Sequence, residues 1–329
     1  MRIALLSALL VLIAIWVVPV IFLPSMHQTE NDVYRRFSGG RLGQWLSVSQ
    51  ASALHWPYAW ASVASYQDSD DPKRKPLKIT PACPEPHAFL SKSGWSLWEE
   101  LPLLKTPNSP GTASYEIYRV HLRPEVWSSE MERKVVVAFA GTAAASLQDW
   151  KSNFRWLLAR FYPQDAFEVL TDTFVPEFVK AYRERSEQPG GNWLKTAQVV
   201  ATGHSLGGGL AERFAYSLNA DYGIPTVKEV YAFDPSPVSG KRSVKGWEKQ
   251  ARGLTIYRIY NRGEILASVR SLFALVEKPP IEEGQTWIDI RYRDNWTWRT
   301  LLPSGTVHAH GMFDLACFMK KSLNTDKTE

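Results

Sequence analysis

Residues 198–219 constrain the fold more than any other part of the chain. The apolar run Gln198–Thr202 predicts a strand buried on both faces. The stretch Leu206–Asn219 predicts a helix, because apolar residues recur at every fourth position from Leu210 onward. A buried strand that leads through a glycine-rich turn into a helix is typical of a βαβ unit. This stretch therefore indicates an α/β protein with parallel strands.

Other segments extend the same alternation of strands and helices, which predicts a mostly parallel central sheet flanked by helices. We expect strands at Tyr115–Val120, Lys134–Phe139, Val227–Phe233 and Leu254–Tyr260, helices at Ala51–Tyr66 and Thr171–Arg185, a strand or strand-loop at Gly94–Leu104, and a loop at Asp68–Pro86.

The N-terminal segment predicts a membrane anchor. Ile3–Leu23 is an uncharged and almost wholly apolar run, long enough to cross a bilayer core as a helix. The residues that follow make a poor cleavage site, so a retained transmembrane helix at 1–24 is favoured over a signal peptide. We expect a linker at 25–50 and a globular domain at 51–329. An anchor of this kind usually leaves the following domain outside the cytoplasm, which is the periplasm in a bacterium.

Composition and charge narrow the classes of function. The net charge of +5 suits an anionic membrane surface, but no basic stripe with interleaved aromatic residues occurs, so nucleic acid is not an expected partner. Cys83 and Cys317 form no C-x-x-C pair, and no metal site is expected. The two cysteines are compatible with one disulfide or with two buried thiols.

The turn between the strand and the helix carries the chemistry. It reads Gly203-His204-Ser205-Leu206-Gly207, the G-x-S-x-G pattern of a nucleophile elbow, in which a serine on a strained turn stands clear of the sheet. Glycines at both ends leave room for neighbouring backbone. The helix N-terminus directs free N–H groups at developing negative charge. The plainer alternative is a glycine-rich turn that only caps a helix.

A second turn offers an oxyanion hole. The buried strand Lys134–Phe139 ends in Ala140-Gly141-Thr142. The backbone N–H groups of Thr142 and Leu206 are the candidate donors to a tetrahedral oxyanion, each contributing about 3–4 kcal/mol to lowering the barrier. By itself, such a turn is equally an ordinary strand end.

Together these motifs resemble the class 3, or fungal-type, lipases. The resemblance rests on Val135–Thr142, on Asp149-Trp150 with Asn153, and on Gly203–Gly208, and it spans roughly residues 50–318. It implies the α/β-hydrolase fold and an oxyanion role for Thr142. It also implies a lid over residues 143–156 that carries Trp150, for which a simple buried helix is the alternative. Ala140 departs from the family, which usually has arginine there.

The resemblance also orders the triad as serine, acid and histidine. His310 fits the family pattern of a late histidine followed by an aromatic residue, with His308 as the fallback. Glu264 stands where the family carries its aspartate, and Asp234, at another strand end, is the rival acid. His204, beside the serine, is expected to pack rather than to act in catalysis.

The function predicted is therefore hydrolysis of carboxylic esters of lipids, by a lipase or phospholipase with the triad Ser205, His310 and Glu264 and no cofactor. The partners expected are a lipid or ester substrate and the membrane. One alternative keeps the triad but changes the substrate, giving a thioesterase, an acyltransferase or a soluble-ester esterase. Another is an inactive, membrane-tethered scaffold.

Overall fold

The computed structural model of the 329-residue chain describes residues 28–29, 31–37, 43–66, 77–99, 101, 111–120, 122–141, 164–236, 239–261, 283–293 and 311–323. Several predictions fall outside these ranges: the anchor at 1–24, Thr142, the lid at 143–156, Glu264, His308 and His310. Among the residues described, no helix has the length and apolar character needed to span a bilayer.

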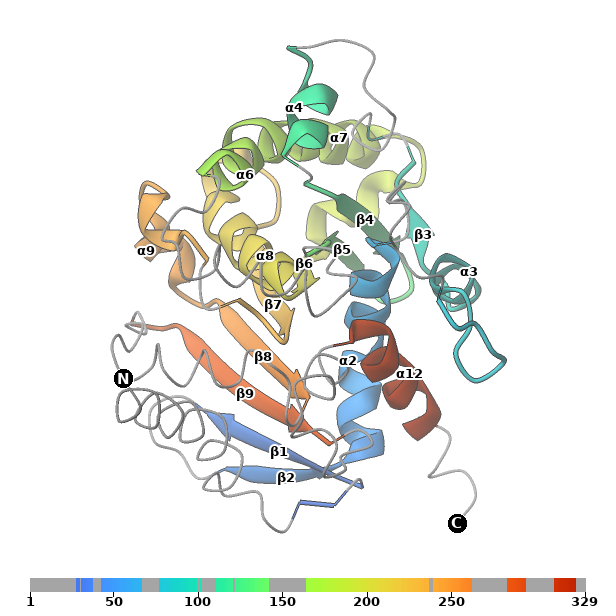
Figure 1. Cartoon of the computed structure of the whole chain (residues 1–329). Helices are drawn as coiled ribbons and strands as arrows, with labels where there is room; N and C mark the ends of the chain where they lie inside the picture. Colours follow the sequence, from blue (N-terminus) through green and yellow to red (C-terminus); the bar gives the residue numbers. More distant parts are fainter. Residues whose placement is uncertain are drawn as a thin grey trace, which may run out of the picture.

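The described residues form one mixed sheet of nine strands in the order β2-β1-β9-β8-β7-β6-β5-β4-β3 (Figure 1). The strands from β5 to β9 are parallel, and antiparallel pairs extend the sheet at both edges. The prediction of a mostly parallel sheet is thus correct for the centre and wrong for the edges. The strands are β1 (Asp32–Phe37), β2 (Gln44–Ser47), β3 (Ser96–Leu97), β4 (Pro124–Ser129), β5 (Lys134–Phe139), β6 (Gln198–His204), β7 (Val227–Phe233), β8 (Thr255–Asn261) and β9 (Thr286–Tyr292).

Helices cover both faces of this sheet, and each face has its own hydrophobic core (Figure 1). One face packs against α2 (Val48–Ala64), α3 (Pro86–Lys92) and α12 (Met312–Ser322). The other packs against α4 (Ala113–Arg119), α6 (Gln164–Val169), α7 (Val175–Glu187), α8 (Leu206–Ser217) and α9 (Trp247–Ala251). A π-helical turn, Leu170–Phe174, joins α6 to α7, and short 3₁₀ turns lie at Gly191–Thr196, Ala220–Tyr222 and Lys241–Ser243.

The central elements agree closely with the sequence prediction. Strands β5, β6, β7 and β8 and helices α2, α7 and α8 all lie where the apolar patterns placed them, and β3 falls within the predicted strand-loop. Long apolar runs and helical periodicity are the strongest local signals, so these elements were the most predictable ones.

The strand predicted at Tyr115–Val120 is wrong, because these residues belong to helix α4 and its C-cap. The Thr112 hydroxyl caps the helix by accepting the Tyr115 N–H at 3.2 Å. Only Ile117 of α4 is deeply buried. The alternation of apolar and polar residues here did not reflect a sheet face.

The predicted linker at 25–50 contains ordered strands. β1 pairs antiparallel with β9, and β2 pairs with β1, so both strands are part of the sheet. The side chain of Gln28 is fully buried and donates to the carbonyl oxygens of Asp32 and Arg291, the latter at 2.8 Å. The folded unit therefore begins well before residue 51.

A disulfide joins Cys83, just before α3, to Cys317 in α12, with the two Cα atoms 5.1 Å apart. The sequence alone left this bond open. It ties together two helices on the same face of the sheet, and α12 begins two residues after His310.

Candidate active site

Ser205 occupies the sharp turn between β6 and α8. Its backbone angles are φ 58° and ψ −120°, a region that residues with a side chain rarely adopt. Strain of this kind persists only where the surroundings impose it, and it occurs most often at functional sites. The structure thus gives Ser205 the geometry that the nucleophile elbow predicts.

Close backbone packing explains the glycines of the elbow. A Cβ on Gly203 would lie close against the Gly207 carbonyl oxygen, and one on Gly207 would collide with the Phe139 carbonyl oxygen at the end of β5. The expected need for glycine at these two positions is confirmed.

Backbone hydrogen bonds hold Ser205 from the side of β7. The Ser205 N–H donates to the Phe233 carbonyl at 2.9 Å, and the Ser205 carbonyl accepts from Ser236 at 2.9 Å and from Gly208 at 3.1 Å. The turn after β7 therefore fixes both backbone groups of the nucleophile.

The turn after β5 lies against the other side of the elbow. A Cβ built on Gly141 would lie 3.2 Å from the Leu206 nitrogen and 2.5 Å from the Tyr66 hydroxyl oxygen. Gly141 therefore lies directly beside Leu206, whose backbone N–H is one of the two predicted oxyanion donors.

Tyr66 is a member of the site that the sequence did not reveal. Its hydroxyl hydrogen-bonds with Nδ1 of His204 at 2.9 Å and donates to the His204 carbonyl at 3.3 Å. His204 is largely buried. This agrees with the expectation that the residue before the nucleophile packs inside the protein.

Asp234, the rival acid, is placed at the end of β7. It is 1% exposed and, like Ser205, has a positive φ, at 39°. Its Oδ1 accepts the N–H of Asn261 at 3.0 Å, and its own N–H donates to Ile259 at 2.7 Å. Its carboxylate is thus engaged with the end of β8, the strand that precedes Glu264.

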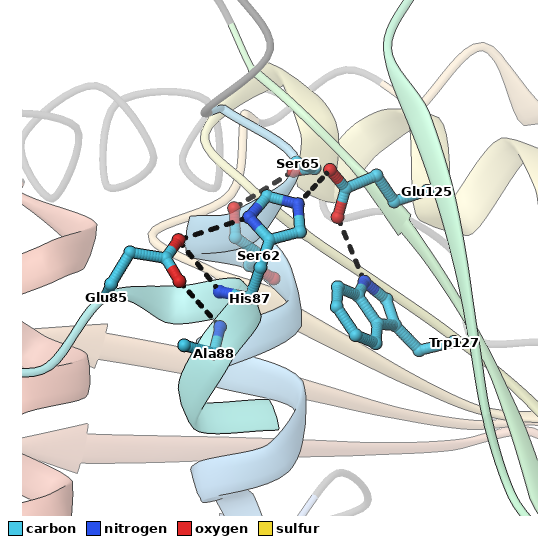
Figure 2. A network of polar contacts seen from close by, with 7 residues as sticks. All are labelled: Ser62, Ser65, Glu85, His87, Ala88, Glu125 and Trp127. Carbon is cyan, nitrogen blue, oxygen red and sulfur yellow. Dashed lines mark hydrogen bonds and ion pairs between the residues drawn. The ribbon is translucent and has the colours of Figure 1, made fainter. Parts of the chain in front are cut away.

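A second polar network, partly buried, is drawn in Figure 2 and includes Glu125 of β4, which is two strands from β6. His87 on α3 lies between two carboxylates: Nε2 is 3.0 Å from Glu125 of β4, and Nδ1 is 3.3 Å from Glu85. The other oxygen of Glu125 accepts from the indole N–H of Trp127 at 2.9 Å. Burial alone lowers the pKa of His87, but Glu125, with help from Glu85, raises it to about 9.

His87 contacts the carboxylates of Glu85 and Glu125, and Glu125 also accepts from Trp127; charges paired in this way indicate a structural role. Within the described ranges, no group of three or more His, Cys, Asp or Glu side chains is arranged so that it could hold a metal ion. The elbow remains the site with the geometry for chemistry.

A mixed sheet with helices on both faces and a serine elbow after a central parallel strand defines an α/β hydrolase. The family model described as Lipase (class 3) matches residues 136–273, which include Gly141, the elbow and Asp234. This match supports the resemblance to class 3 lipases seen in the motifs. The activity class that follows is ester hydrolysis of the lipase type.

Among solved structures, the chain is similar to a Rhizomucor miehei lipase in a propeptide complex. The two are 14% identical, the similarity covers 88% of each chain, and the TM-score is 0.44. No curated protein matches the chain in sequence.

Proposed function

We propose that this protein is a membrane-anchored lipase or phospholipase that uses Ser205 as nucleophile, His310 as base and Glu264 as the triad acid. Ser205 attacks the acyl carbonyl while His310 takes its proton, and His310 then returns the proton to the leaving alcohol. Water hydrolyses the acyl-enzyme in the second half of the reaction. The observation that carries the proposal is the strained backbone of Ser205 at the turn between β6 and α8.

Strand spacing favours Glu264 over Asp234 as the acid. A triad spans about 8 Å from the serine oxygen to the carboxylate, because two hydrogen bonds of about 2.8 Å flank an imidazole ring. Neighbouring strands lie about 4.8 Å apart. β7, which ends just before Asp234, adjoins β6, which ends just before Ser205, whereas β8, which precedes Glu264 in the chain, is two strands from β6. The wider separation accommodates an intervening histidine.

The oxyanion is proposed to bind to the backbone N–H groups of Leu206 and Thr142. Support comes from Gly141, which brings the chain just before Thr142 against the Leu206 nitrogen. The Leu206 N–H lies in the first turn of α8, so this donor needs little rearrangement as negative charge develops on the substrate.

A location outside the cytoplasm, beside a membrane, completes the proposal. The apolar segment Ile3–Leu23 supports an anchor. The Cys83–Cys317 disulfide supports an oxidising compartment, which is the periplasm in a bacterium. Lipid esters are the proposed substrates, since the anchor would hold the site next to them.

The test is hydrolysis of p-nitrophenyl esters of increasing chain length by the full-length protein in detergent. We expect activity that rises with chain length or at a micelle interface, and a loss of about 10⁴-fold or more in Ser205→Ala. Ser91→Ala, an exposed serine on α3, is the matched control and keeps the wild-type rate. If neither wild type nor Ser205→Ala hydrolyses any of the esters, the result favours an inactive scaffold. If wild type prefers short soluble esters, the result favours an esterase.

A further inference from the structure

The edge of the sheet formed by β1 and β2 exposes aromatic surface. β2 is the outermost strand at this edge, away from β3 at the other (Figure 1). Trp45 of β2 is 49% exposed, and the centroid of its ring lies 5.0 Å from that of Tyr34 on β1. Edge strands usually carry charged residues rather than large aromatic ones, because an apolar edge invites aggregation in water. An exposed aromatic pair at this edge therefore indicates a surface that meets a partner.

Arginines gather on the same face of the sheet, next to the aromatic pair. In the ladder of β1 with β9, Tyr34 stands opposite Arg291. Two residues further along β1, Arg36 stands opposite Asp289. Arg258 of β8 also stands opposite Asp289 and forms an ion pair with it at 2.6 Å. Because residues directly opposite each other in neighbouring strands share a face, three guanidinium groups surround one carboxylate here.

The charges around Arg36 leave this part of the edge positive. Burial lowers the pKa of Arg291 below its usual range; the charge of Arg36 adds to the lowering, and Asp289 opposes it. Arg36 itself is exposed, so an anion can approach it. The carboxylate of β1, Asp32, lies four residues from Arg36 and accepts from the Thr29 hydroxyl at 2.6 Å. An anionic partner is therefore favoured beside Arg36.

The chain enters this surface soon after the proposed anchor. The anchor occupies residues 1–24, and β1 begins at Asp32, with Gln28 already buried in the fold. β1 and β2 are thus the first described strands that follow the bilayer along the chain. Trp and Tyr side chains favour the boundary between lipid tails and head groups, and each arginine near an anionic bilayer gains about 1 kcal/mol. The membrane that holds the anchor therefore matches both the aromatic pair and the charge.

The edge surface is defined by the aromatic pair and the two arginines beside it: Tyr34, Trp45, Arg36 and Arg291. We propose that the edge surface docks onto the bilayer that holds the anchor and binds its anionic head groups. The aromatic rings enter the interface, and the guanidinium groups contact lipid phosphates. This inference rests on the anchor in the proposed function but not on the chemistry at the elbow. Anchor and edge surface together fix how the domain sits on the membrane.

The experiment places the full-length protein in vesicles of phosphatidylcholine alone or of equal parts of phosphatidylcholine and phosphatidylglycerol. A fluorescent dye is attached through Gln44→Cys, at an exposed position beside Trp45, as the edge dye. Met131→Cys, 77% exposed in the turn between β4 and β5, carries the control dye. Lipids with a spin-labelled head group quench dyes that lie at the membrane surface. In the anionic vesicles we expect the edge dye to be quenched about 2-fold more than the control dye.

Variants separate docking from tethering, because each keeps the anchor. Arg36→Gln with Trp45→Ala removes a charge and the exposed ring, so quenching of the edge dye should fall to that of the control dye. Lys180→Gln with Tyr118→Ala changes the same kinds of exposed side chain on α7 and α4, and it should leave the quenching unchanged. Wild type gives a second measurement that needs no variant to fold: quenching of its edge dye should weaken without phosphatidylglycerol and in high salt.

The remaining outcomes overturn the proposal. Equal quenching of the edge dye in both lipid mixtures contradicts it, and so does quenching that persists in the folded double variant. If edge dyes quench one another as the ratio of protein to lipid rises, whatever the lipid charge, a second copy of the chain covers β2 instead.

Flotation of the vesicles after an alkaline wash tests the anchor separately. Protein that washes off disproves the anchor and the docking together, whereas retained protein whose quenching ignores lipid charge disproves the docking alone. Because hydrolysis is not measured, a failure of the proposed triad leaves this result unaffected.

Discussion

The elbow and the His87 network show two different ways of burying polar groups in one domain. At the elbow, the backbone is strained at Ser205 and crowded around Gly207. In the network of Glu85, His87 and Glu125, the backbone is regular and opposite charges are paired within 3.0–3.3 Å (Figure 2). The first arrangement costs stability and holds reactive geometry, whereas the second satisfies buried charge.

This contrast gives a rule for separating function from architecture in the chain. Substitutions at the elbow should change turnover more than folding, and substitutions in the His87 network should change folding more than turnover. Each of the following variants is a way to break or sharpen that distinction.

The largest effect on stability is expected for Glu125→Ala. The substitution takes the nearer carboxylate from the partly exposed His87 ring and leaves the buried Trp127 indole N–H without its acceptor. Leaving a buried donor unsatisfied typically costs about 1–3 kcal/mol, and the lost contact with His87 adds to this. Urea unfolding of Glu125→Ala measures the loss, with Glu116→Ala, an exposed pair member on α4, as the control. A loss below about 1 kcal/mol, the range of surface pairs, would contradict the assignment.

The next effect concerns turnover, in Gly141→Ala. The new Cβ would approach the His204 carbonyl oxygen to 2.4 Å and the Leu206 nitrogen to 3.2 Å, so the turn must move away from the elbow. Displacing one oxyanion donor costs about 10²–10³ in kcat, or roughly 3–4 kcal/mol of barrier. Gly190→Ala, at a glycine with open space but a φ of 83°, is the control for backbone strain alone; it should lower stability and leave kcat per site titrated with a fluorophosphonate probe unchanged. If kcat per titrated site is unchanged in Gly141→Ala, the result contradicts the proposal that the Thr142 and Leu206 N–H groups bind the oxyanion.

The smallest effect is a pH dependence of stability. The pKa of His87 is raised from 6.5 to about 9, so its stabilisation is complete below about pH 6.5 and is lost as pH rises through 9. After discounting for partial exposure, we expect about 1–2 kcal/mol. Unfolding of wild type and His87→Asn at pH 6 and pH 9.5 measures it. The two proteins should converge at the higher pH, and a constant gap would show that packing, not charge, is lost.

The sequence predicted the elements whose signal is local. The run at 134–139 and the stretch from β6 through the elbow to α8 were correct because buried parallel strands and amphipathic helices carry strong patterns. The edge hairpin of β1 and β2 was missed because short antiparallel edge strands have little pattern of their own.

For the site, the sequence predicted the strained turn at Ser205 and its two glycines, but it did not predict the residues that hold this turn in place. Tyr66 is 138 positions from His204, and His87 is 38 positions from Glu125. Such contacts form because the sheet brings distant segments of the chain together, and no local sequence motif predicts them. Thr142, Glu264 and His310 stay predictions, and the Gly141→Ala variant tests the role of Thr142.

The burial of Gln28 has a consequence for how far the enzyme can reach. Gln28 donates to the carbonyl oxygens of Asp32 and Arg291, so only residues 25–27 separate the proposed anchor at 1–24 from the folded domain. Fully extended, the path from Pro24 to Gln28 covers at most about 14 Å. An enzyme on so short a tether would search the bilayer in two dimensions. Its substrates would be the lipids of its own membrane, and those of a facing membrane would lie beyond it.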